Sequence, residues 1–291
     1  MRNQGKVIGD WLADVRASFC VTALVVLAAA LWGCSGEPEL MDPPARTPGP
    51  PDLEAVLDRI GTNASKWRTL DAECNVTISS AYLRGQGGQI TRRGGRLRIL
   101  KPGKIMLRVP EKGELAIGMV GDGERYTLNM PVFGESYSAR YGSPLPVDQL
   151  RITFMPDDLV DALDYTNLFG PRRKVPVIRQ MGGLYVIDCL RMVTEPKADL
   201  YVDSSLTFEP NSNNVMMYRK YQPDGSLRAE IRYPGWDLYQ AAPGEDDRQA
   251  AARLPGRLWL AYPPSRTLIM ITLEDVTLNE ELDPAQFELE E

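Results

Sequence analysis

The clearest pattern in the chain is an alternation of apolar and polar residues that begins at Leu70. In the stretch LDAECNVTI every second residue is apolar, and polar or acidic residues lie between them. A period of two is typical of a β-strand with one face buried and the other in water. The apolar positions of this predicted strand are Leu70, Ala72, Cys74, Val76 and Ile78.

Similar short stretches follow along the chain, separated by turn residues. Examples of these turns are Pro102-Gly103, Gly121-Asp122-Gly123 and Pro223-Asp224-Gly225. Short strands joined by hairpin turns at this spacing predict an antiparallel meander, here of about eleven strands. An antiparallel sheet of that length is expected to curl.

Two segments have helical periodicity instead. Residues 53–66 follow Asp52, a favoured N-cap, and their apolar positions recur every three or four residues. Residues 157–169 are the second predicted helix. Two helices cannot cover both faces of a long sheet, so we expect them to cover one face or fill its concave side. The predicted class is mainly β, or α+β, and residues 52–291 are predicted to form one domain.

The N-terminus has the pattern of an export signal. Arg2, Lys6 and Arg16 precede an apolar run over residues 17–32, which is shorter than the roughly 20 residues that span a bilayer. The run ends in LWGC, which resembles the bacterial lipobox. The resemblance implies that residues 1–33 are a cleaved signal peptide and that Cys34 carries lipid. The alternative is a short transmembrane helix with an incidental cysteine.

The residues after Cys34 bear on location. Ser35 is not an aspartate, and in the enterobacterial sorting rule that lets a lipoprotein pass to the outer membrane. Residues 35–51 contain six prolines and predict an extended tether about 50 Å long at about 3.1 Å per residue. We therefore expect residues 34–51 to anchor the domain by lipid to the outer membrane, facing the periplasm.

Composition excludes several kinds of site. The chain has no histidine, which removes the commonest general base and metal ligand, and no cofactor or metal motif is present. The formal net charge is −6, or −7 without residues 1–33, which argues against nucleic-acid binding. We expect no enzymatic activity. Cys74 and Cys189 are either a disulfide or two buried thiols.

Two charged clusters depart from the average. Six basic residues between positions 92 and 104 are either a solvated sheet edge or a surface for anionic lipid head groups or an acidic partner. Asp157, Asp158 and Asp161 open the second predicted helix, where we expect them to be solvated and favoured by the helix dipole. The basic residues are Arg92, Arg93, Arg96, Arg98, Lys101 and Lys104.

The order of strands and turns resembles the family of LolA, LolB and RseB. The segments that carry the resemblance are LRILKPGKIMLRV, GDGERYTLNMP, the strand and hairpin from LYVD to EIRY, and the closing LIMITLEDVTLNEELDPAQFEL. The resemblance covers most of residues 52–289. It implies an open, strongly curved antiparallel half-barrel of about eleven strands, with a helical lid and an apolar hollow that takes acyl chains.

The alternation of strand faces predicts which residues line such a hollow. Ile105 and Leu107 share one face of their strand, whereas Met106 and Arg108 share the other. The same residues fit an ordinary core equally well. The predicted lining residues are Ile78, Ile105, Leu107, Tyr126, Leu128, Tyr218, Leu260 and Met270.

The sequence therefore leaves three hypotheses for function. The first is a membrane-anchored lipoprotein that binds lipid, or the acyl chains of other lipoproteins, in envelope trafficking. The second is an RseB-like regulatory module of the same fold that binds a periplasmic protein partner without lipid transfer. The third is a structural surface lipoprotein without a ligand.

Overall fold

The structure of the chain is a computed structural model, which describes residues 52–83, 88–148, 150–164, 174–193, 199–209, 212, 214–240 and 251–289. The predicted signal peptide, Cys34 and the tether lie outside these residues. The segment Gly49–Glu291 is one compact unit and holds every described element. Within the described ranges, no helix combines the length and apolar character that crossing a bilayer requires.

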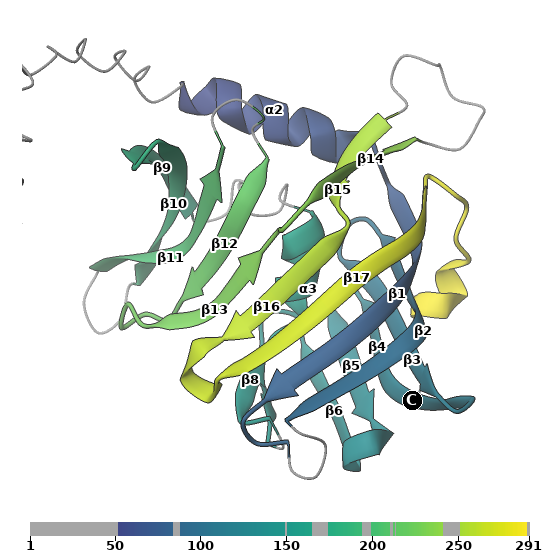
Figure 1. Ribbon diagram of the computed structural model, residues 1–291. Coiled ribbons are helices and arrows are strands. Elements are labelled where there is room, and N and C mark those ends of the chain that lie inside the picture. Colours follow the sequence, from purple (N-terminus) through teal and green to yellow (C-terminus); the bar gives the residue numbers. More distant parts are fainter. Residues whose placement is uncertain are drawn as a thin grey trace, which may run out of the picture. The chain divides into compact units, whose positions relative to one another are not determined.

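A single antiparallel sheet of thirteen strands dominates the unit (Figure 1). Its strand order is β6-β5-β4-β3-β2-β1-β17-β16-β13-β12-β11-β10-β9, so β1 and β17 join the two halves of the sheet. The strands are β1 (Thr69–Ser80), β2 (Gln89–Leu100), β3 (Lys104–Glu111), β4 (Glu114–Asp122), β5 (Arg125–Met130), β6 (Glu135–Arg140), β9 (Lys174–Met181), β10 (Leu184–Val193), β11 (Asp199–Phe208), β12 (Val215–Tyr221), β13 (Leu227–Arg232), β16 (Arg257–Tyr262) and β17 (Thr267–Leu278).

Two short ribbons accompany the main sheet. One pairs β7 (Leu145–Val147) with β8 (Ile152–Phe154), and the other pairs β14 (Trp236–Gln240) with β15 (Ala251–Pro255). The sequence predicted about eleven strands, so the main sheet is longer than expected and both ribbons are additional. The fold class itself, a mainly β, open and curved antiparallel sheet, is confirmed.

The alternation in β1 is confirmed residue by residue. Leu70, Ala72, Cys74, Val76 and Ile78 are all buried. The neighbouring β2 approaches closely at Gly95, where an added Cβ would lie 2.9 Å from the sulfur of Cys74. A glycine is therefore needed where these two strands bulge past each other.

The first predicted helix is confirmed as α2 (Leu53–Ser65). The side chain of Asp52 caps it by accepting a hydrogen bond from the Glu54 N–H at 3.2 Å, and Val56, Ile60 and Ala64 form its buried face. The second helix, α3 (Pro156–Leu163), is shorter than predicted because Asp164 adopts an extended conformation and ends it. Residues 165–169 of the predicted helix lie outside the described residues.

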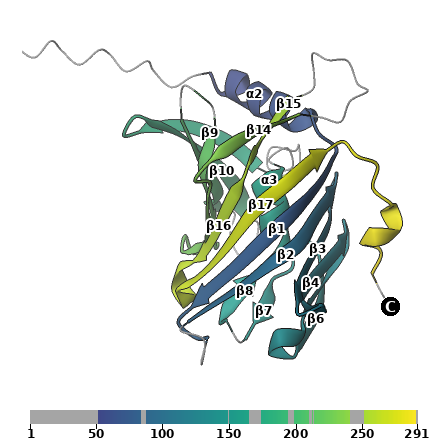
Figure 2. The same ribbon diagram turned by 45° about the vertical axis from the view of Figure 1, so that its right-hand side comes forward.

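The sheet curves around α3 and the β7–β8 ribbon, and α2 lies across one end of it (Figures 1 and 2). One large cluster of buried apolar side chains fills this concave side. A smaller cluster of Met106, Leu282 and Phe287 packs on the opposite face of β3. Cys74 and Cys189 are both buried thiols and do not form a disulfide.

The basic stripe is not a sheet edge, because β2 lies between β1 and β3. Arg96 and Arg98 both bind the carboxylate of Asp71, at 2.5 and 2.9 Å. Burial alone would raise the pKa of Asp71, but the two guanidinium groups hold it below its ordinary value. Two of the six basic residues thus neutralise a buried carboxylate, and the expectation that the stripe forms a solvated sheet edge is wrong.

Candidate functional site

The concave side of the sheet contains a small cavity of about 60 Å³. Strands of the main sheet form one wall, and the β7–β8 ribbon and α3 form the other. Fifteen described residues line it and all are apolar, so none of them has a polar side chain that could orient a ligand. They are Val76, Ile78, Leu107, Ile117, Met119, Leu128, Met130, Val147, Leu150, Ile152, Phe154, Leu159, Leu260, Ile269 and Ile271.

The structure brings half of the predicted lining residues to this cavity: Ile78, Leu107, Leu128 and Leu260. Three others, Ile105, Tyr126 and Tyr218, are fully buried in the surrounding core and do not reach the cavity wall.

Met270 is the exception to the predicted arrangement. Its neighbours Ile269 and Ile271 line the cavity, and successive residues of a strand point to opposite faces. Met270 therefore lies on the other face of β17, in register with Thr77 and Trp259. Parity alone does not distinguish the two faces of a strand whose residues are all apolar, as in LIMI.

Sequence analysis missed eleven of the lining residues, six on strands of the main sheet and five on the ribbon and α3. Val147, Leu150, Ile152 and Phe154 come from the ribbon, and Leu159 comes from α3. The ribbon lies in a segment rich in turn residues, SPLPVDQLRITF, whose short alternating stretch LRITF is the signal that could have revealed a strand. The alternate burial of β7 and β8 identifies the face that packs on the sheet.

A buried cluster of charges fixes α3 to the sheet behind the cavity. Asp158 has no exposed surface and accepts two hydrogen bonds from Arg228, both at 2.8 Å. Lys220 lies 2.9 Å from Asp158 and 2.7 Å from Asp161. The expectation that these aspartates are solvated is therefore wrong for Asp158, which pairs with cations of β12 and β13.

The charges in the cluster compensate one another. Burial would raise the pKa of Asp158, but Lys220 and Arg228 outweigh burial and hold it below its ordinary value. Burial would likewise lower the pKa of Lys220, and the two aspartates hold it well above its ordinary value. Asp158, Lys220 and Arg228, whose pKa is also raised by Asp158, therefore remain charged at neutral pH. Removing one partner would leave a buried charge uncompensated.

Asp157 lies beside the cluster, and no cation among the described residues forms an ion pair with it. One of its carboxylate oxygens accepts the Gly142 N–H at 2.7 Å, and the other is buried with no hydrogen-bond partner among the described residues. Burial raises the pKa of Asp157 to about 6, against the opposing attraction of Lys220. The surroundings of the Asp157 carboxylate therefore favour its charged form less than the surroundings of Asp158 do.

Lys101 connects the ends of both helices. Its ammonium group donates to the Ala64 carbonyl at 2.7 Å, lies 3.4 Å from Asp164, and sits 3.5 Å above the centre of the Trp67 ring. Burial lowers the pKa of Lys101 to about 8, although Asp164 opposes the change. Lys101 therefore ties the end of α2 to the end of α3.

The described residues offer no alternative site for metal chemistry. In the ranges that the structure covers, no three acidic or cysteine side chains gather as metal ligands would. The most distinctive feature of the concave side remains an apolar cavity closed by a ribbon and a helix.

Comparison with known proteins supports the fold and does not assign a function. No protein-family model matches the sequence, and no curated protein does either. A putative outer membrane lipoprotein-sorting protein domain from Vibrio parahaemolyticus is similar with a TM-score of 0.51 and 12% identity, over 81% of this chain and 97% of that chain.

Two further solved structures have the same coverage, 81% of this chain and 97% of theirs. A DUF1329 family protein from Desulfovibrio piger has a TM-score of 0.49 and 13% identity. A LolA superfamily protein from Nitrosomonas europaea has a TM-score of 0.48 and 14% identity. Identities this low concern the fold alone: the likeness to the Vibrio parahaemolyticus domain shows that the two chains share the fold of a curved, open antiparallel sheet.

Proposed function

We propose that the chain is a membrane-anchored lipoprotein that binds lipid, or the acyl chains of other lipoproteins, on the concave side of its sheet. The observation that supports this proposal is the composition of the cavity wall, in which all lining residues are apolar. A hydrocarbon chain needs apolar surface and no specific polar partner, and such a wall provides it. Cys34 would carry the anchoring lipid and hold the domain at the outer membrane.

The size of the cavity sets a requirement on the mechanism. An engineered apolar cavity of about 150 Å³ accommodates benzene. The cavity here, at about 60 Å³, is smaller and cannot hold an acyl chain without movement of its wall. The main sheet is continuous through hydrogen-bonded neighbours, whereas β7 and β8 pair with each other and with no other described strand. We expect the ribbon to move away from the sheet when a chain enters.

Binding of a neutral apolar fluorescent probe tests this proposal. N-phenyl-1-naphthylamine should bind the Gly49–Glu291 fragment with micromolar affinity, about −8 kcal/mol. Leu107→Glu should weaken binding at least tenfold because it places a charge in the cavity wall. Leu238→Glu is the matched control, since Leu238 is 62% exposed and lies outside the cavity.

Leu107→Glu also carries a risk of unfolding, so Leu107→Ala is a second variant. It should cost about 2–5 kcal/mol of stability and leave the probe a larger cavity. A folded Leu107→Glu variant that binds the probe as well as the original chain would contradict the proposed site. Mass spectrometry of solvent extracts from the purified fragment should then identify any lipid that accompanies it.

The small volume of the cavity favours one alternative. If the wall does not open, the domain is better explained as a regulatory module of the same fold that binds a periplasmic protein. A fragment that binds no apolar probe, carries no lipid and captures a defined envelope protein would support this alternative.

A further inference from the structure

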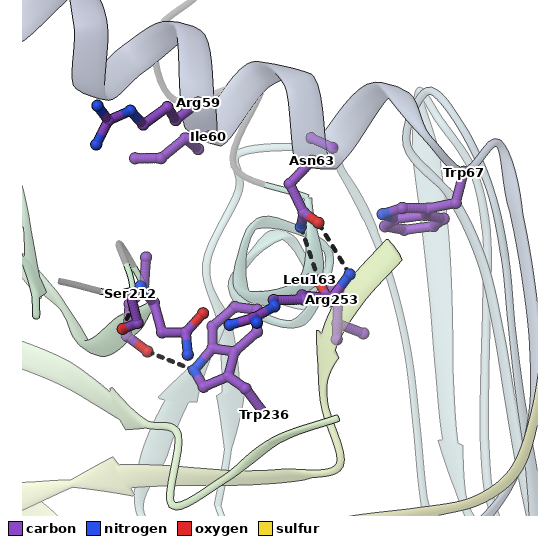
Figure 3. Close-up of a pocket in the computed structure, with 11 residues that line it drawn as sticks. Arg59, Ile60, Asn63, Trp67, Leu163, Ser212, Trp236 and Arg253 are labelled. Carbon is purple, nitrogen blue, oxygen red and sulfur yellow. Dashed lines mark hydrogen bonds between the residues drawn. The ribbon is translucent and has the colours of Figure 1, made fainter. Parts of the chain in front are cut away.

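A second cavity, of about 120 Å³, lies between α2 and the β14–β15 ribbon (Figure 3). It is separated from the apolar cavity by α3, which contributes Leu159 to the apolar cavity and Leu163, one turn later, to this one. Side chains from α2, the residue Trp67 just after it, and both strands of the ribbon meet here. We call it the rim cavity.

The rim cavity contains an unsatisfied hydrogen-bond donor. Trp67 is only 2% exposed, and its indole N–H is buried with no acceptor among the described residues. Figure 3 shows the indole nitrogen on the side of the ring nearer Asn63, toward the cavity. The other indole at the cavity, that of Trp236, donates to the Val215 carbonyl at 2.8 Å. A buried donor without an acceptor is costly, so this N–H favours a ligand that brings an acceptor to it.

The ring of Trp67 cannot easily turn its N–H elsewhere. The Lys101 ammonium lies 3.5 Å above the ring centre, and the same ammonium is bound to the Ala64 carbonyl of α2. Cation–π contact and hydrogen bonding therefore hold the ring in place. The donor is preorganised toward the cavity.

Two arginines lie at the mouth of the rim cavity. Arg59 projects from α2 and Arg253 from β15, both are exposed, and neither forms an ion pair within the part of the chain that the structure describes. Asn63 fixes their two elements together, because its side-chain amide exchanges two hydrogen bonds of 2.8 Å with the backbone of Arg253. Asn63 thus holds α2 and β15, the elements that carry the two arginines, against each other, and Figure 3 shows the Arg59 guanidinium pointing away from Asn63.

The remaining wall is apolar and includes Ile60, Leu163 and Trp236. A site with a fixed N–H donor, two guanidinium groups and an apolar wall matches an oxyanion attached to hydrocarbon. Guanidinium groups bind carboxylate and phosphate through paired, charge-assisted hydrogen bonds. A cavity volume of about 120 Å³ is the volume that about four water molecules occupy in the liquid. This is enough for such a head group and its first carbons.

We propose that the rim cavity binds the carboxylate or phosphate head group of an amphiphile. Trp67 donates a hydrogen bond to one oxygen of the head group, and Arg59 and Arg253 neutralise its charge at the mouth. The inference rests on the proposed function for the hydrocarbon part, which would have to pass α3 to reach the apolar cavity, and adds the chemical class of the ligand, an anionic amphiphile. The head group and the hydrocarbon contact different parts of the wall, so separate variants test the two contacts.

Calorimetric titration of the Gly49–Glu291 fragment with four probes tests the inference. The probes are dodecanoate, dodecyl phosphate, dodecanol and inorganic phosphate, with the amphiphiles kept below their micelle-forming concentrations. At least one of the two anionic amphiphiles should bind at least tenfold more tightly than dodecanol, and which one does so identifies the head group. Inorganic phosphate alone should bind much more weakly, because it lacks the apolar part.

The variants separate the head group from the chain. Trp67→Phe keeps the ring beneath Lys101 and removes the N–H, and Arg253→Gln removes one charge from an exposed side chain that should not affect folding. Each should reduce the preference for the anion over dodecanol at least threefold and leave dodecanol binding unchanged. Arg140→Gln, an exposed arginine on β6 away from the rim cavity, is the charge-matched control and should change nothing.

The outcomes distinguish the two proposals. If dodecanol binds as tightly as both anions, or the Trp67 and Arg253 variants keep the full anion preference, the rim cavity is not a head-group site, and the proposed function still stands. If none of the amphiphiles binds, the proposed function fails and the inference fails with it.

Discussion

Replacing Asp157 with asparagine should stabilise the domain at neutral pH. The folded chain holds this carboxylate in a buried position that raises its pKa from 3.8 to about 6. At 1.36 kcal/mol for each unit of pKa, ionisation of Asp157 costs the folded state up to about 3 kcal/mol. Asparagine removes that cost and keeps an oxygen that can accept the Gly142 N–H, now bonded at 2.7 Å.

Two effects reduce the expected gain in the free energy of unfolding. Asp157 lies in the first turn of α3, where a negative charge contributes roughly 0.3–1 kcal/mol through the helix dipole. It also keeps some exposure to water, which screens its charge. We therefore expect Asp157→Asn to raise the free energy of unfolding at pH 7 by about 1–2 kcal/mol, or by a few degrees in Tm for a domain of this size.

The pH dependence identifies the cause. Between pH 3.8 and about 6 the folded state binds more protons at Asp157 than the unfolded state does, so its contribution to stability falls as the pH rises. Urea unfolding of both fragments from pH 4 to pH 8 should show a difference near zero at pH 4 that grows to its full value above pH 6. A constant difference across that range, or a variant less stable at pH 7, would refute the reasoning.

Four further predictions follow from the structure and the sequence. Arg228→Met should lower the free energy of unfolding by about 3–5 kcal/mol in urea titrations, because it leaves Asp158 buried with less compensation. The stability of the original fragment should rise from pH 8 to pH 10, because Lys101 titrates near 8 when folded and near 10.5 when unfolded, and Lys101→Met should remove this rise. Cys34→Ala should leave an unprocessed precursor without lipid, detectable by mass spectrometry. Membrane fractionation should recover the chain with outer-membrane markers, and recovery mainly with inner-membrane markers would contradict the sorting prediction.

The sequence predicted local order better than long-range contacts. Alternation placed Ile105 and Leu107 in the main core and Met106 on the opposite face, as the structure does. The N-cap and apolar face of α2 were equally visible, because both depend on neighbours within one or two turns. These features are local, so a single sequence contains them.

The buried charged cluster behind the apolar cavity could not be predicted from local sequence patterns. Asp158 and Lys220 are separated by about sixty positions, and each has the ordinary appearance of a solvated charge at a helix start or in a strand. Only the folding of α3 into the concave side removes both from water and pairs them. The rim cavity escaped prediction for the same reason, since α2, β14 and β15 are distant along the chain and meet only in the folded state.

The pairing of β1 with β17 has a consequence for the order in which the domain forms. These two strands lie at the middle of the sheet, with Cys74 beside Leu273, so nearly the whole domain lies between the partners. While β17 is still missing, β1 and β16 each present an unpaired edge of hydrogen-bonding groups. Closing so long a loop is slow compared with forming the local hairpins on either side. A chain emerging from its N-terminus can thus build two separate half-sheets early, but it completes one curved sheet only after its last strand has emerged.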